Sequence, residues 1–208
     1  MKKIITLLVL LCTISISAQT QYEKGMEKAF ELWKENKTTE AAQLFERISK
    51  VEKENWLPSY YAGTIYILES FQIKEEAMRI AKLHKAQEFI DTANSISPEN
   101  PEILIMQALL HTSYMAFDGQ KYGMTLSMKN AGLYEKALKI APNNPRVILS
   151  KAESDMGTAR FFGQSTKPFC ANIKKAIALG EKEKITEKFY PKFNIERAEK
   201  VLKKCMKL

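Results

Sequence analysis

A spacing of small, bulky and proline residues recurs at a nearly constant interval along this sequence. It is clearest between Lys85 and Glu102, where the small Ala86, the bulky Ile90 and the small Ala93 precede Pro98. The same residue types recur 45 residues earlier and 44 residues later, at Ala41, Phe45 and Ile48 and at Asn130, Tyr134, Ala137 and Pro142. Such a period is typical of repeat proteins, in which each unit buries its apolar face against its neighbours. The sequence therefore predicts a helical repeat protein.

Apolar residues at intervals of three and four predict a pair of helices in each repeat. We expect units over residues 22–54, 56–99, 100–143 and 144–180, followed by a capping helix over residues 194–207. Two units open with the same dipeptide, Asn100-Pro101 and Asn144-Pro145. Asparagine suits the N-cap of a helix and proline suits its first position. The last helix is expected to cap the array, because an end repeat needs a polar outer surface.

The spacing on the second helix of each unit resembles that of the tetratricopeptide repeat (TPR) family, and small residues recur on the first helices at Ala29, Gly63, Ala108 and Ala152. The resemblance covers residues 19–208. It implies an all-α, right-handed superhelical solenoid of antiparallel helix pairs, whose concave groove binds peptides or partner proteins. The small-to-small distance is 12 residues in the first unit but 23 and 22 in the next two. The extra residues predict either helices longer by up to about 15 Å or a protruding loop.

The reversals within the two long units are expected at different kinds of site. The one in the second unit falls at a weakly marked site, residues 70–72, because no glycine or proline is available there. The one in the third unit is expected over residues 118–123, which have turn chemistry.

Residues 1–18 have the pattern of a secretory signal peptide. Lys2 and Lys3 precede an apolar run, Ile4–Ile16, which ends in the small pair Ser17-Ala18. The run is shorter than the roughly 20 residues that a membrane-spanning helix requires. An uncleaved anchor and lipidation at Cys12 are the alternatives. We therefore predict an exported bacterial protein, periplasmic in the first instance, with an extracellular or envelope-associated location as the alternative.

The basic residues are unevenly distributed. Lys167–Leu208 holds 12 basic residues against 5 acidic ones. Such a segment can attract an anionic membrane surface or an acidic partner, and a solvated lysine-rich face is the alternative. Nucleic acid is not an expected partner, because no basic motif is interleaved with aromatic residues.

Two cysteines, Cys170 and Cys205, follow the predicted signal peptide. Their helices are expected to be antiparallel neighbours. If Gly180 lies opposite Ile195, the two cysteines face each other. We predict a disulfide in an exported chain, and two buried free thiols are the alternative.

The sequence contains no recognisable catalytic or metal-binding motif. Its two histidines, His84 and His111, each stand alone on a largely apolar segment, whereas metal sites need clustered ligands. There is no serine elbow, no HExxH motif and no glycine-rich phosphate loop. We therefore predict a protein that is not an enzyme and that has no metal site and no cofactor.

Aromatic and methionine side chains gather in the third unit, at Tyr114, Met115, Phe117, Tyr122, Met124 and Met128. Such side chains offer large and adaptable contact areas, so we predict that they bind a peptide or a partner protein. The alternative is that they fill the space between longer helices. A second aromatic pair, Phe161 and Phe162, precedes Gly163 and is expected to anchor the cap.

The predicted function is a non-enzymatic scaffold of the bacterial cell envelope that binds a protein or a peptide. The alternative is an architectural subunit that docks to a membrane surface or an envelope complex through its basic C-terminal segment.

Overall fold

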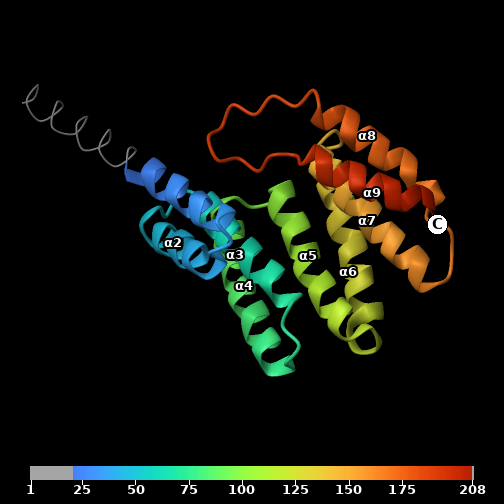
Figure 1. The fold of residues 1–208 in the computed structure, drawn as a ribbon, viewed down its shortest axis with the longest axis horizontal. Helices are drawn as coiled ribbons and strands as arrows, with labels where there is room; N and C mark the ends of the chain where they lie inside the picture. The colour runs from blue at the N-terminus through green and yellow to red at the C-terminus, as the bar shows by residue number, and fades with distance from the viewer. Residues whose placement is uncertain (1–20, 208) are drawn as a thin grey trace, which may run out of the picture. The chain divides into compact units, whose positions relative to one another are not determined.

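The structure, a computed structural model, describes residues 21–207 (Figure 1). All the regular secondary structure in that range is helical, which confirms the predicted all-α fold. Within the same range, no helix is long and apolar enough to cross a membrane. The predicted signal peptide, residues 1–18, lies outside the described residues. The chain forms two compact units, one ending at Ile96 and the other beginning at Ser97.

The first unit contains a helix over residues 21–34, then α2 (Thr38–Val51), α3 (Leu57–Ser70) and α4 (Glu76–Ile96). Aromatic rings fill its core. Phe30 contacts Phe45 and Tyr61 edge-on, with ring centroids 5.2 and 4.7 Å apart. On α4, the small residues Ala86 and Ala93 are fully buried, as the repeat spacing predicts.

The reversal between α3 and α4 contains neither glycine nor proline. It follows Ser70, within the predicted range of residues 70–72. The carboxylate of Glu75 accepts hydrogen bonds from the backbone N–H groups of Ala77 and Met78, at 3.0 and 2.7 Å. The Glu75 side chain thus pairs two N–H groups that a helix start otherwise leaves unpaired. The helix that follows, α4, is 21 residues long.

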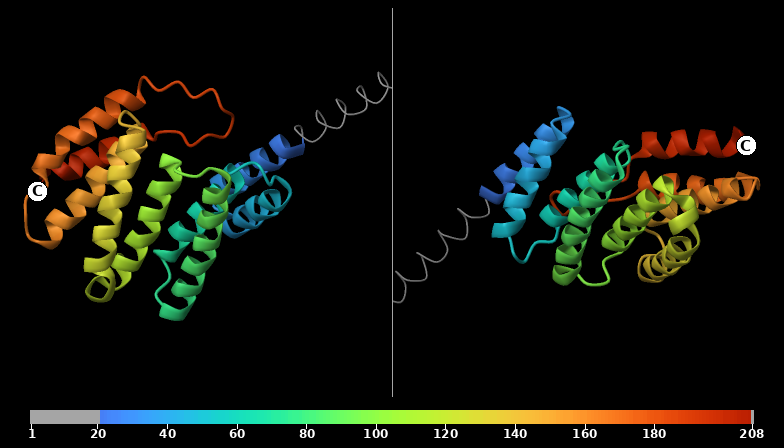
Figure 2. Two further views of the ribbon diagram at one scale, coloured as in Figure 1. Left: turned by 180° about the vertical axis from the view of Figure 1, so that it is seen from behind. Right: turned by 90° about the horizontal axis from the view of Figure 1, so that it is seen from below.

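The second unit contains the helices α5 (Pro101–Phe117), α6 (Gly119–Ile140), α7 (Pro145–Phe161), the short 3-10 helix η1 (Lys167–Phe169), α8 (Cys170–Gly180) and α9 (Ile195–Lys207). The predicted N-caps are confirmed: Asn100 Oδ1 accepts from Glu102 N and Asn144 Oδ1 accepts from Arg146 N, both at 2.9 Å. The two helices of the α5–α6 hairpin lie side by side in every view (Figure 2).

The predicted turn over residues 118–123 is wrong. A single residue, Asp118, separates α5 from α6, and its carboxylate accepts a hydrogen bond from Lys121 N at 2.9 Å. Gly119 and Gly123 lie inside α6, where a β-carbon added to either residue would have no neighbouring atom within 4 Å. The extra residues of this repeat therefore lengthen the helix to 22 residues and build no protruding loop.

The last part of the second unit packs around a core that includes Met156, Cys170, Ile173, Ala198 and Cys205. Residues 181–194 form an irregular connector between α8 and α9. The ring of Phe193 lies so close to Gly180 that a β-carbon there would overlap it. Contact with the connector therefore begins at the last residue of α8.

Candidate functional site

Two candidate binding residues of the third repeat, one on each helix, meet near the tip of the α5–α6 hairpin. Tyr114 of α5 and Tyr122 of α6 have ring centroids 5.2 Å apart and an interplanar angle of 54°. Both tyrosines are half-buried, as are Met115 and Phe117. We call this group, with Met124 and Met128, the hairpin tip.

Two methionines of the hairpin tip do not fill the core. Met124 and Met128 are one turn apart on α6, and their exposed fractions are 80% and 66%. The alternative that these side chains only occupy space between long helices therefore does not hold for the two methionines. It describes the half-buried Met115 and Phe117 better.

The hairpin tip is suited to non-covalent contact. Lys121 Nζ lies 4.9 Å from the centroid of the Tyr122 ring. Burial raises the pKa of Tyr114, and the neighbouring Tyr122 adds to the effect, so its phenol stays protonated near neutral pH. The aromatic pair can stack on a flat group, and the exposed thioethers of α6 offer a separate apolar contact.

A polar cluster joins α5 to α6 within the same hairpin. Asn130 is buried; its Nδ2 donates to the carbonyl oxygen of Ala108 at 3.0 Å, and its Oδ1 lies 2.7 Å from His111 Nδ1. Because the Asn130 oxygen can only accept, His111 carries its proton on Nδ1. Its Nε2, 3.1 Å from Gln107 Nε2, is then the acceptor.

This cluster was missed by sequence reasoning, which treated His111 as an isolated residue. The signal was present in Asn130, a polar residue at a position that the repeat pattern fills with a small one. Burial lowers the pKa of His111, and its hydrogen bond to Asn130 only partly opposes this effect. His111 is therefore neutral near pH 7 and serves to join the two helices.

A second buried polar network lies at the start of α5 and α7. Glu102 is fully buried, and its Oε1 accepts from Asn144 Nδ2 at 2.6 Å and from Arg146 Nε at 2.9 Å. Arg146 also donates to Glu183 Oε2 at 2.7 Å and lies over the Tyr190 ring, 5.4 Å from its centroid. This network attaches the connector to the helix starts, and sequence reasoning did not predict it.

The hydrogen bonding of Glu102 is incomplete. Its second oxygen, Oε2, has no hydrogen-bond partner among the described residues. Burial raises the pKa of Glu102, although Arg146 and Asn144 act in the opposite direction. Because the partners of Glu102 come from the protein itself, we assign this network a structural role.

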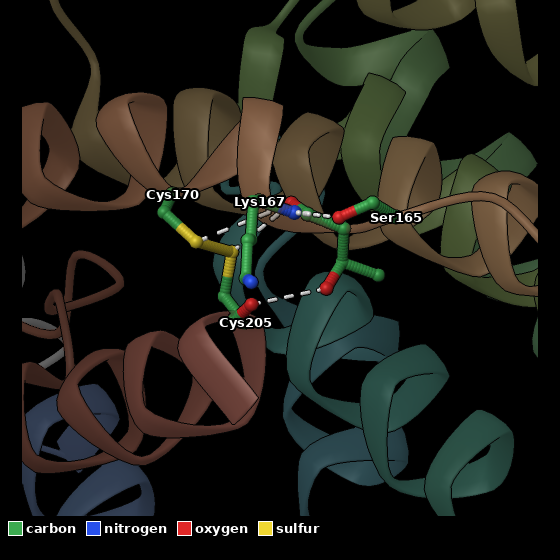
Figure 3. Close-up of a disulfide and its surroundings, with 5 residues drawn as sticks. Ser165, Lys167, Cys170 and Cys205 are labelled. Atoms are coloured by element: carbon green, nitrogen blue, oxygen red, sulfur yellow. Dashed lines mark hydrogen bonds between the residues drawn. A yellow bond between two sulfur atoms is a disulfide. The ribbon is translucent and has the colours of Figure 1, made fainter. Parts of the chain in front are cut away.

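The two cysteines are brought together at the other end of the second unit. Cys170 and Cys205 form a disulfide, with sulfur atoms 2.06 Å apart and Cα atoms 5.8 Å apart (Figure 3). Close by, Thr166 Oγ1 donates to the carbonyl oxygen of Cys205 at 3.0 Å. The end of α9 is thus fixed to the segment between α7 and α8.

Phe161 and Phe162 do not anchor the cap as expected. They stand at the end of α7 with exposed fractions of 79% and 66%, and their rings contact each other edge-on at 5.2 Å. The left-handed backbone of Gly163, with φ of 66°, turns the chain immediately after them. The residues that pack around the disulfide come instead from α7, α8 and α9.

Among residues 21–207, no group of three or more histidine, cysteine, aspartate or glutamate side chains is placed to hold a metal ion. The described hydrogen bonds of His111 likewise all go to protein side chains.

Comparison with solved structures finds two proteins of similar fold. The chain is similar to the HusA haemophore from Porphyromonas gingivalis, with a TM-score of 0.74 and 22% sequence identity over 88% of this chain and 92% of that one. It is also similar to TTC0263, a thermophilic TPR protein of Thermus thermophilus, with a TM-score of 0.58 and 15% identity over 77% and 75% of the two chains. At these identities the likeness shows the fold alone.

These findings define a helical repeat protein. The structural neighbours support the helical repeat fold that the resemblance implies, and the TPR neighbour supports the predicted class of helical solenoid. No family model matches the chain, and no curated protein matches it significantly.

Proposed function

We propose that this chain is a non-enzymatic binding protein that holds a flat, apolar ligand of the porphyrin class at the hairpin tip. The observation that carries the proposal is the Tyr114–Tyr122 pair between α5 and α6, on a hairpin that also exposes two methionines. The likeness to a haemophore, a protein that carries haem, over most of both chains supports the choice of ligand class.

The contacts proposed for the ligand are ring faces and thioethers. Stacking on an aromatic ring contributes about 0.5–1.5 kcal/mol beyond the area buried, and methionine adapts to irregular apolar shapes. His111 is a poor candidate to ligate the iron of haem, because its Nε2 already accepts a hydrogen bond from Gln107. If ring stacking alone holds the ligand, iron-free protoporphyrin should bind about as tightly as haem. Tighter binding of haem would indicate that a tyrosine or methionine of the site ligates the iron.

The test is an absorbance titration with haem and with iron-free protoporphyrin. Replacing Tyr114 and Tyr122 together by serine should weaken both affinities about tenfold or more, because two stacking contacts are lost. Phe71→Ser, a partly exposed aromatic residue of the first unit, is the matched control and should change neither affinity. Equal binding by the tyrosine variant would remove the hairpin tip from the site. Absence of binding by the unmodified protein would reject the ligand class.

A second candidate ligand is an extended peptide or a partner helix, which the TPR-like repeat favours. Exposed methionines and tyrosines also suit this kind of partner. A photo-crosslinker at Tyr122, in an extract of the cell envelope, tests this candidate. One dominant partner that unlabelled protein displaces would support it, whereas diffuse labelling would count against it.

The proposed location is the bacterial cell envelope, with the periplasm first. The pattern of residues 1–18 supports this location, as does the disulfide, which persists in oxidising compartments. Mass spectrometry of the exported protein tests it. A first residue at Gln19 is expected, and an intact or lipid-modified N-terminus would contradict the proposed cleavage.

A further inference from the structure

The disulfide end of the second unit exposes apolar and basic side chains together. Phe161 and Phe162 project from the end of α7, and Met206 on α9 is half exposed. The cations are also exposed: Arg160, Lys167, Lys203, Lys204 and Lys207. We call these eight residues the docking end. It shares no residue with the hairpin tip, so a role for the docking end does not depend on the proposed ligand.

Covalent and hydrogen-bonded links hold these residues near one another. Thr166, four residues after Phe162, donates to the carbonyl oxygen of Cys205. Four residues of chain span at most about 14 Å, so Phe162 lies within that distance of Thr166. The three lysines of α9 lie within two residues of Cys205 in sequence, which the disulfide fixes to Cys170. Figure 3 shows this junction.

The charge of the docking end has a single sign. No aspartate or glutamate occurs between Asp155 and Glu181, or between Glu199 and Lys207. Clusters of four to eight lysines or arginines attract anionic lipids, each contributing about 1 kcal/mol near the surface. Exposed phenylalanine adds apolar area that water solvates poorly. Cations around an exposed aromatic pair therefore complement a surface with negative head groups above an apolar layer.

We propose that the docking end binds an anionic membrane surface, with the Phe161 and Phe162 rings inserted among the lipids and the cations on their head groups. Apolar insertion supplies attraction that salt does not screen, whereas the lysine contribution weakens as ionic strength rises. Attachment by both contributions is reversible, since it rests on two side chains and a few charges.

The test is cosedimentation of the full chain with vesicles of phosphatidylcholine containing phosphatidylglycerol, compared with phosphatidylcholine alone. The apolar N-terminal segment contributes equally to every variant, so differences between matched variants are the readout. Phe161→Ser with Phe162→Ser should lower the partition onto anionic vesicles at least fivefold. The control is Val51→Ser with Met78→Ser, because these residues have similar exposed fractions, 76% and 63%. The control should bind like the unmodified protein.

Two triple lysine variants distinguish binding by a local basic surface from attraction by the overall charge of the protein. Lys203→Gln, Lys204→Gln and Lys207→Gln together should lower the partition about tenfold or more. The same three-charge change at Lys182, Lys184 and Lys192 of the connector should have a much smaller effect. Equal losses in the two triple variants would overturn the proposal in favour of diffuse attraction. Unchanged binding in the phenylalanine variant would also overturn it. Binding to polyglutamate but not to anionic vesicles would overturn it in favour of an acidic protein partner.

Discussion

Glu102 and Arg146 occupy the same position in consecutive repeats and form a buried ion pair, with Arg146 Nε 2.9 Å from Glu102 Oε1. Each residue follows an Asn-Pro dipeptide that starts a helix, and 44 residues separate the two dipeptides. The repeat thus places opposite charges at equivalent sites, and the pair links the start of α5 to the start of α7.

Arg146→Met should destabilise the protein by about 3–5 kcal/mol, because it leaves Glu102 buried without its cation. The double variant Glu102→Met with Arg146→Met should lose less than the single variant, since the fully buried charge is gone and Glu183, the other partner of Arg146, is partly exposed to water. Denaturation by urea measures both. An equal loss in the two variants would show that packing, rather than charge, accounts for the effect.

The same single variant should show a distinctive pH dependence. The folded-state pKa of Glu102 is already raised by burial, and loss of Arg146 raises it further. A carboxyl group with a raised folded-state pKa binds more protons when folded, so stability increases as pH falls towards about 4.5. The deficit of Arg146→Met should therefore shrink between about pH 8 and pH 5.

The two helix-capping asparagines should respond differently to the same substitution. Aspartate is as good an N-cap as asparagine, so Asn100→Asp should change the free energy of unfolding by less than about 0.5 kcal/mol. Asn144→Asp should cost about 1–3 kcal/mol, because Asn144 Nδ2 also donates to Glu102 Oε1 and a carboxylate there would face another. Thermal denaturation of the two variants under the same conditions gives the comparison, and equal melting temperatures would contradict the contact.

Gly180→Ala should destabilise the protein by about 1–3 kcal/mol through overpacking. A β-carbon at this position would overlap the Phe193 ring, which cannot move aside as a flexible chain end does. Gly157→Ala is the matched control. It lies inside α7 with no atom within 4 Å of the added carbon, so the change should stabilise the helix by up to about 1 kcal/mol. Stabilisation in both variants would show that the connector does not pack on Gly180.

Removal of the disulfide should lower stability by about 4 kcal/mol in the chain-entropy account, since the cysteines are 35 residues apart in sequence. Denaturation of the unmodified protein with and without reductant measures the loss. The variant Cys170→Ser with Cys205→Ser should melt at the same temperature in both conditions. If reductant leaves the unmodified protein unchanged, the two cysteines are free thiols.

His111 should make the protein less stable in mild acid. Its folded-state pKa is lowered by burial, so the folded state favours the neutral imidazole. The stability from this group is complete above the ordinary histidine pKa of about 6.5 and is lost as pH falls through the folded-state pKa. Nuclear magnetic resonance titration of the His111 ring measures the shift directly, and a pKa above 6.5 would contradict the dominant effect of burial.

Local chemistry made much of the fold predictable. The caps at Asn100 and Asn144 and the long α4 follow from dipeptides and from apolar spacing, which act over a few residues. The juxtaposition of Cys170 and Cys205 also followed from an assumed antiparallel register.

The errors concern side chains whose partners are distant in sequence. Sequence reasoning expected a turn at Gly119 and Gly123, but the Asp118 cap makes a one-residue connection sufficient. The contacts of His111 with Asn130 and of Glu102 with Arg146 join different helices, so no local pattern reports them. In the candidate site, the sequence grouped Tyr114 and Tyr122 in one unit but did not predict their ring contact. The exposure of the Phe161–Phe162 pair was not predicted either.

Most packed helices in this protein are neighbours in the chain, as in the pairs α3–α4, α5–α6 and α7–α8. Contacts of this kind require little loop closure, and proteins rich in them fold in microseconds to milliseconds. Each hairpin can thus form as soon as its second helix has been made. The helices α8 and α9 are joined by a longer, irregular connector, residues 181–194. We therefore expect α9 to dock last and the disulfide to form at the end of folding.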